Sequence, residues 1–153
     1  MAGKPNPSMH DEQRDAETLS TAVRLMVGQF ARRLRSEAEA ADHSPLQEAV
    51  VYRLGHTAGL SGADLARLEG VRPQSMSLTL QTLERAGLIQ GAPDPTDGRR
   101  TLLNLTEAGH TALSTALTRK QTWLVGALLN ELTSDERQAL HRSLELLTRL
   151  LRR

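Results

Sequence analysis

The sequence predicts a mainly α-helical fold with one small β-hairpin, and three observations support this expectation. Apolar residues recur every three or four positions over several long segments, which is the period of an amphipathic helix. Glycines, prolines and capping residues stand where these segments begin and end. A short alternating segment, residues 101–106, follows a stretch rich in turn-forming residues and indicates the return strand of a hairpin. The 153 residues suit a single domain.

The N-terminal segment, residues 1–16, is expected to be a flexible arm because its glycine and prolines disfavour regular structure. A first long helix is predicted over residues 17–42. Its apolar stripe consists of Leu19, Val23, Met26, Phe30 and Leu34. Ser44 and Gln47 then have the spacing of a capping box, which predicts the start of a second helix.

Residues 61–87 indicate two helices separated by a tight turn. Ser61 is suited to N-cap a short helix, and Gly70 stands where that helix ends. Pro73 fits the first turn of the next helix, which Gly87 closes. Along this second helix the spacing predicts a buried stripe of Met76, Leu80 and Leu83 opposite a mostly polar face.

A hairpin follows the second helix. Its turn is the segment GAPDPTDG, and Asp97, Arg99 and Arg100 lie at its tip. Together with the helices before it, the hairpin completes the order of a winged helix-turn-helix, which we assign to residues 44–105. In that fold the second helix enters the major groove of DNA, and the wing reaches the adjacent groove.

The candidate DNA contacts follow from this arrangement. On the second helix they are Arg72, Gln74, Ser75, Ser77, Leu78, Thr79 and Arg85, and on the wing they are Asp97, Arg99 and Arg100. The Ser61 hydroxyl is a candidate phosphate contact. An exposed charge pair stabilises a fold little, whereas a guanidinium suits a narrow, electronegative minor groove, where Asp97 could orient Arg99. The alternatives are a solvated helix face and a solvated loop with a local ion pair.

Two further helices are predicted over residues 106–153, the first capped by Thr106 and the second opened by a capping box of Thr133 and Glu136. The last helix repeats leucine at positions 140, 144, 147 and 150. With residues 17–42, these helices carry more apolar surface than the small winged module can cover. A two-fold homodimer would bury the excess and space two recognition helices for a palindromic site, although packing within one chain is the alternative.

Two segments, LARLEGVRPQSMSLTLQTLERAGLI and DPTDGRRTLLNLTEAG, resemble the MarR (multiple antibiotic resistance regulator) family of bacterial winged-helix transcription factors. The second segment is the more specific one. It has an aspartate, one residue, an arginine and an apolar strand that ends in Leu-Thr-x-x-Gly, which corresponds here to Asp97, Arg99, Leu105, Thr106 and Gly109. The resemblance covers residues 17–151.

This resemblance implies one domain over residues 17–153, with residues 17–42 and 106–153 as dimerisation helices. It implies that Arg99 enters the minor groove and that Ser75, Ser77 and Leu78 face the major groove. Many relatives carry arginine or another polar residue at the position of Leu78, and a leucine there could touch a thymine methyl but cannot pair with guanine. It further implies a homodimeric repressor of a palindromic operator, released by a small, often aromatic or anionic, ligand.

Composition argues against several other classes of protein. Cysteine is absent, which excludes disulfides, cysteine-ligated zinc and a thiol sensor. The five histidines are scattered, and neither a nucleophile elbow nor a glycine-rich phosphate loop occurs, so we expect no enzyme, metal or cofactor. No apolar run approaches the length of a membrane span, so a cytoplasmic protein without a membrane partner is expected.

Charge alone does not decide the function. The formal net charge is +1, and residues 61–105 contain five arginines against five acidic residues. The case for duplex DNA therefore depends on where the charges point. The remaining alternative is a winged-helix adaptor that binds protein instead, and a steep loss of duplex binding with salt would discriminate against it.

Overall fold

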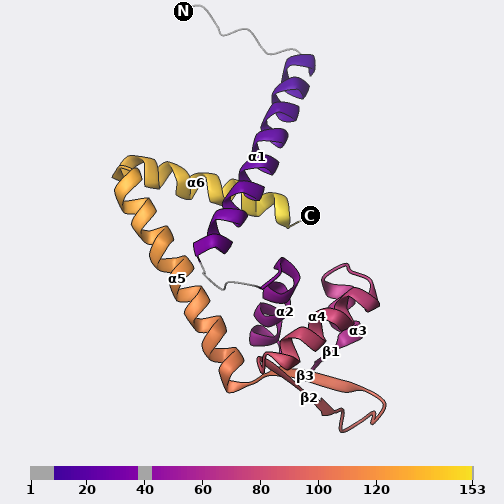
Figure 1. Ribbon diagram of the computed structural model, residues 1–153. Helices are drawn as coiled ribbons and strands as arrows, with labels where there is room; N and C mark the ends of the chain where they lie inside the picture. Colours follow the sequence, from indigo (N-terminus) through magenta and orange to yellow (C-terminus); the bar gives the residue numbers. More distant parts are fainter. Residues whose placement is uncertain (1–8, 38–42, 153) are drawn as a thin grey trace, which may run out of the picture. The chain divides into compact units, whose positions relative to one another are not determined.

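The computed structural model of the chain describes residues 9–37 and 43–152. The chain divides after residue 37 into two units, each described by itself. The first contains α1 (Met9–Glu37). The second contains, in order, α2 (Pro45–His56), β1 (Leu60–Ser61), α3 (Gly62–Leu68), α4 (Pro73–Arg85), β2 (Ile89–Pro93), β3 (Thr101–Leu105), α5 (Glu107–Glu131) and α6 (Ser134–Leu151) (Figure 1). The predicted fold class, mainly α with a small β-wing, is confirmed.

Helix α1 begins at Met9, so the prediction of a flexible arm over residues 1–16 is wrong for residues 9–16. The last helix-breaking residue in this region is Pro7, and acidic residues in the first turn of α1 favour a helix N-terminus. The Gln13 side chain also donates a hydrogen bond to Glu17 one turn later, at 3.0 Å. Residues 1–8 of the predicted arm and residues 38–42 of the predicted first helix lie outside the described residues.

The helix boundaries of the winged module follow the predicted capping signals. Ser44 and Ser61 each form a complete capping box, with Gln47 and Asp64 respectively. Gly70 and Gly87 have φ angles of 64° and 69°, a backbone conformation that glycine adopts without steric cost. The start of α4 at Pro73 is as predicted.

The three strands form an antiparallel sheet in the order β1-β3-β2. Strand β2 pairs with β3 from Ile89 opposite Leu105 to Pro93 opposite Thr101. Strand β1 pairs on the other side of β3, with Ser61 opposite Leu102. This strand was not predicted, because it is only two residues long and its second residue is also the N-cap of α3.

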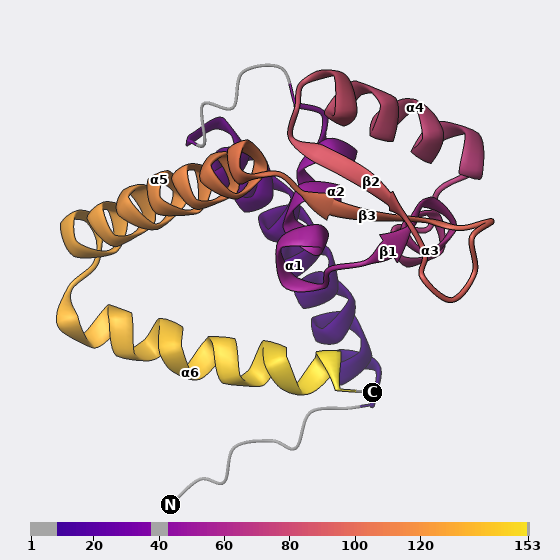
Figure 2. The same ribbon diagram turned by 90° about the horizontal axis from the view of Figure 1, so that it is seen from below.

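The core of the second unit is aliphatic and lies between the helices of the winged module and its sheet. Its buried members are Val50, Val51, Leu54, Leu65, Ala66, Met76, Leu83, Ile89, Leu103 and Leu105. Helix α4 packs against α3 and β2, as Figure 2 shows. The predicted inward face of α4 is therefore confirmed, with Met76 and Leu83 buried and Leu80 partly buried against them.

The junction between β3 and α5 explains the Leu-Thr-x-x-Gly pattern. Thr106 caps α5 by accepting a hydrogen bond from the Gly109 N–H at 3.0 Å. Its own hydroxyl donates to the Gly87 carbonyl at 2.6 Å, and its backbone N–H donates to the Leu88 carbonyl at 3.0 Å. A Cβ atom at Gly109 would collide with that same Leu88 carbonyl. The start of α5 is thus fixed against the chain that connects α4 to β2.

Gly109→Ala should destabilise the protein by about 1–3 kcal/mol, because backbone must move to admit the methyl group. Gly126→Ala is the matched control on the same helix, since a Cβ there meets nothing within 4 Å. We expect this control to be neutral or slightly stabilising. Urea unfolding at one fixed protein concentration would measure both, and equal stabilities for the two variants would contradict the close packing.

Helices α5 and α6 begin and end close to their predicted positions. Thr133 and Glu136 form the predicted capping box of α6. The Lys120 ammonium lies 3.2 Å from the Glu48 carboxylate and links α5 to α2. Helices α1 and α6 contain no buried residue. Within the described ranges, every helix is too short or too polar to cross a bilayer.

Candidate nucleic-acid interface

The face of α4 opposite the core is exposed and carries the residues predicted to meet DNA. Gln74, Ser75, Ser77, Leu78 and Arg85 are all exposed, and Thr79 is half-buried. Leu78 is the unusual member, because 61% of its surface is accessible although it is a large apolar side chain. A single exposed leucine is ordinary on a protein surface, so Leu78 indicates a contact only together with the polar residues beside it.

Three hydroxyl groups on α4 donate to carbonyls of the preceding turn. Ser77, Thr79 and Thr82 each donate to the carbonyl four residues earlier, at 3.0 Å. In this rotamer the hydroxyl proton is already used, and the oxygen presents only acceptor lone pairs outward. A hydroxyl of this kind would meet a donor, such as an amino group on a base edge, in preference to an acceptor.

The N-terminus of α4 differs from those of its neighbours. Between residues 43 and 152, the other four helices have a Ser or Thr N-cap whose side chain accepts a backbone N–H. Helix α4 has Arg72 at this position, with no capping hydrogen bond. Its first N–H groups are consequently not satisfied by a cap side chain, and the positive end of the helix dipole lies beside a cation. Both features favour a phosphate group there.

The tip of the wing, residues 94–100, is a compact turn. The Asp94 N–H donates to the Arg100 carbonyl at 2.9 Å and closes the hairpin, and the Arg100 N–H donates to the Asp97 carbonyl at 2.9 Å. The Asp94 carboxylate accepts hydrogen bonds from the Thr96 hydroxyl and the Thr96 N–H. These bonds hold the pKa of Asp94 below its usual value.

Asp97 shapes the backbone instead of orienting the Arg99 guanidinium. Its carboxylate accepts the Arg99 backbone N–H at 3.1 Å, so the prediction of a side-chain pair is corrected. The Arg99 side chain makes no hydrogen bond or ion pair with any described residue and extends from an exposed position. Among the arginines at the tip, it is the one available to a partner.

Arg100 was predicted to contact DNA beside Arg99, but the structure gives it a different partner. Its Nη2 atom donates to Asp64 Oδ2 at 2.8 Å and lies 3.4 Å from the Ser61 hydroxyl. Both partners stand at the start of α3, which is 36 to 39 residues away along the chain. Arg100 therefore joins the wing to the helix-turn-helix.

The Ser61 hydroxyl, the candidate phosphate contact, is used in the structure as the cap of α3. Only 8% of Ser61 is exposed. Its hydroxyl donates to Asp64 Oδ2 at 2.6 Å and accepts the Asp64 N–H at 3.2 Å. The sequence alone could not separate the two roles, because a serine at a helix N-terminus is suited both to cap the helix and to bind a phosphate group.

Asp64 is the residue that sequence reasoning missed as part of the site. Hydrogen bonds from the Ser61 hydroxyl and N–H, followed by the positive charges of Arg100 and Arg67, hold its pKa below the usual value. The carboxylate therefore stays ionised, and able to accept all these bonds, to a lower pH than a free aspartate. The capping pattern at Ser61 pointed to Asp64, but only the fold brings Arg100 to it.

Comparison with known proteins identifies the family. Residues 44–100 match the model of the MarR family. Over 133 residues the chain is 30% identical to an uncharacterized HTH-type transcriptional regulator of Mycobacterium leprae, a match that covers 87% of the chain and 92% of that protein. The chain belongs to the MarR family.

Solved structures agree with this assignment. The crystal structure of a Pseudomonas aeruginosa protein described as a transcriptional regulator matches with a TM-score of 0.75 and 32% identity, over 95% of this chain and 98% of that one. A mutant of MepR from Staphylococcus aureus, bound to an oligodeoxyribonucleotide, matches with a TM-score of 0.66 and 21% identity, over 87% and 97% of the two chains. The second likeness shows that the fold is shared.

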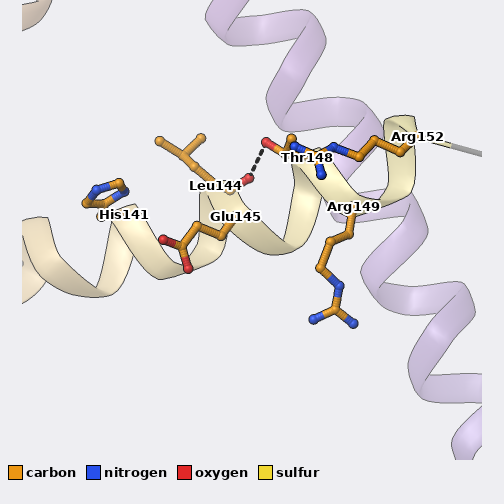
Figure 3. Close-up of a pocket in the computed structure, with 6 residues that line it drawn as sticks. All are labelled: His141, Leu144, Glu145, Thr148, Arg149 and Arg152. Atoms are coloured by element: carbon orange, nitrogen blue, oxygen red, sulfur yellow. Dashed lines mark hydrogen bonds between the residues drawn. The ribbon is translucent and has the colours of Figure 1, made fainter.

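As a MarR-family regulator the chain is a DNA-binding protein and not an enzyme. No group of three or more His, Cys, Asp or Glu side chains suited to a metal ion occurs in the part of the chain that the structure describes. A shallow hollow on α6 is lined by His141, Leu144, Glu145, Thr148, Arg149 and Arg152 (Figure 3). The Thr148 hydroxyl donates to the Leu144 carbonyl at 2.8 Å, a bond within the same helix. We therefore interpret the hollow as ordinary helix surface.

Proposed function

We propose that this MarR-family regulator is a homodimeric repressor that binds a palindromic operator through α4 and the wing. The observation that carries the proposal is the combination of an exposed polar face and an uncapped N-terminus on α4 with an unpaired arginine at the wing tip. The helix would occupy the major groove, and Arg99 would enter the adjacent minor groove. That MepR has been solved bound to an oligodeoxyribonucleotide supports the same use of the fold here.

The dimer is proposed because two helices of the chain leave their apolar faces uncovered. On α1, Leu19, Met26 and Val27 are each more than half exposed, and on α6 Leu144 and Leu150 are as well. Rows of exposed large apolar side chains along a helix are typical of a surface that another chain covers. A two-fold axis would pair these faces and place two copies of α4 on successive half-sites.

Release of the operator is proposed to follow from binding of a small aromatic or anionic ligand, a class that the family resemblance suggests. Such a ligand can shift the equilibrium between two spacings of the recognition helices only if it binds one of them more tightly.

Arg99→Ala should lower the affinity for the operator by about 1–3 kcal/mol, because it removes a groove contact without disturbing any bond within the protein. A fluorescence-anisotropy titration with a duplex selected by the wild-type protein measures the loss. Arg142→Ala, on α6, is the control for the loss of one positive charge. If the two variants bind equally well, the wing has no part in recognition.

Within the recognition helix, Ser77→Ala and Leu78→Ala should each alter the preferred base at one position of the half-site. Leu78 suits a thymine methyl, and the Ser77 oxygen suits an amino group of adenine or cytosine. Arg85→Ala should instead weaken binding to all sequences by a similar factor, as a phosphate contact does. Selection from a randomised duplex pool reads out both effects. If Leu78→Ala selects the same motif as the wild-type protein, Leu78 does not take part in base recognition.

Leu144→Glu should dissociate the dimer, because it places a charge in the middle of the apolar stripe of α6. Gln138→Glu is the matched control, since it adds one negative charge on the opposite side of the same helix. Sedimentation velocity would then find monomers for the first variant and dimers for the second. A stable dimer of Leu144→Glu with full operator affinity would exclude α6 from the interface.

Salt dependence tests the proposal as a whole against a protein-binding adaptor. A regulator that contacts several phosphates loses affinity steeply as salt rises, because each contact releases counterions. A chain that binds no duplex at any salt concentration would refute DNA recognition.

A further inference from the structure

We propose that Arg100 is a positioning residue, which presents Arg99 to DNA by joining the wing to Asp64 and does not itself contact the nucleic acid. This inference rests on the proposed function, because it concerns how the wing reaches the duplex. Arg100 and Asp64 then share one role, which is to hold the base of the wing in the conformation that presents Arg99.

The Arg100 side chain ties the wing tip to the rest of the winged module. Within the described residues, the hydrogen bonds of segment 94–100 all stay inside the hairpin, except the two that Arg100 makes to Asp64 and Ser61. Without this guanidinium the tip would be connected to the module only through strands β2 and β3. A two-stranded ribbon of this kind is marginally stable by itself.

Contacts other than those with the wing already orient the Asp64 carboxylate. Oδ2 accepts the Ser61 N–H at 3.1 Å and the Ser61 hydroxyl at 2.6 Å, while Oδ1 pairs with the Arg67 guanidinium. The capping box therefore already fixes the carboxylate oxygen that accepts the Arg100 hydrogen bond. Forming that bond requires little further loss of entropy from Asp64. Because β1 ends at Ser61, opposite Leu102 of β3, the tie lies directly beside the strand pairing.

The two adjacent arginines, Arg99 and Arg100, differ in whether a partner within the protein already holds the side chain. Arg100 is half-exposed, with 47% of its side chain accessible, and its charge is partly neutralised by Asp64. Arg99 has no such partner among the described residues. A wing held in one conformation presents Arg99 without the entropic cost of ordering the loop on binding. An exposed pair of this type adds little to folding stability, so its loss should appear in DNA binding and not in the melting temperature.

A double-mutant cycle separates positioning from direct contact. Arg99→Gln, Arg100→Gln and the double variant are titrated with a duplex selected by the wild-type protein. We expect Arg100→Gln alone to weaken binding about 3- to 5-fold, which is as much as an exposed charge pair can contribute to holding the wing in one conformation. In the Arg99→Gln background, the same substitution should change the affinity by less than about twofold. Equal factors in both backgrounds would mean that Arg100 contacts DNA independently, which overturns the proposal.

A second cycle tests whether Asp64 is the partner. Asp64→Asn keeps the size of the side chain and an oxygen acceptor for the cap, but it removes the charge that holds Arg100. It should weaken binding by about the same factor as Arg100→Gln, and combining the two should add nothing further. If the affinity of the double variant falls by the product of the two single losses, Asp64 and Arg100 act separately, and the proposal is overturned.

Arg67→Gln is the matched control, because Arg67 pairs with the same carboxylate but belongs to α3 and does not reach the wing. It should leave the affinity within about twofold of wild type and show no coupling to Arg99. A loss equal to that of Arg100→Gln would attribute the effect to charge near Asp64 and would contradict a role in positioning the wing. Thermal melts accompany each variant, and a fall in melting temperature that parallels the loss of affinity would likewise replace positioning by a purely structural role.

The two hypotheses fail in different ways. If the wild-type protein binds no duplex in a salt-dependent manner, the proposed function is refuted, and the role of Arg100 with it. If the wild-type protein binds its selected duplex and the cycle is additive, only the positioning role of Arg100 is refuted, and DNA recognition by α4 and the wing stands.

Discussion

Among the described residues, the buried aliphatic side chains all lie between Val50 and Leu105, and the rest of the structure depends on this constraint. It fixes α4 from behind through Met76 and Leu83, and it fixes the inner face of β3 through Leu103 and Leu105. One small core thus determines the positions of both α4 and the base of the hairpin. The buried faces of these elements supply the packing that stabilises them. Their exposed faces can therefore carry polar groups without loss of stability. The recognition surface is separated from the packing that supports it.

Beyond the core, polar interactions determine where the exposed side chains point. The Asp64 carboxylate connects the N-terminus of α3 to the wing, and the Asp94 carboxylate organises the wing tip. In the proposed function, neither residue needs to touch DNA to influence binding. Each is an exposed or half-exposed group whose bonds add little to folding free energy but restrict the conformations of a short loop. Such groups affect recognition through the order that they impose before the partner arrives.

Local signals in the sequence predicted most of the fold, since a cap, a turn glycine or a helical stripe acts within a few residues. Ser44, Ser61, Gly70, Gly87 and Thr133 all have the predicted roles. The predictions that the structure changed at the base of the wing depended on contacts between distant segments. Arg100 looked available because its partners, Asp64 and Ser61, lie 36 and 39 residues away in the sequence and are brought to it by the fold. Strand β1 was missed for the same reason, because two residues become a strand only when β3 lies beside them. The start of α1 is the exception, where local evidence after Pro7 was sufficient and was misjudged.

The junction at Gly109 decides how the remaining helices can act on the recognition surface. Thr106 bonds to Gly87 and Leu88, and the absence of a side chain at Gly109 lets α5 begin in contact with the Leu88 backbone. The ion pair of Lys120 with Glu48 adds a second connection between α5 and the winged module. These contacts couple the first half of α5 to the winged module. In the proposed dimer, such coupling would let a displacement of α5 change the spacing between the two copies of α4.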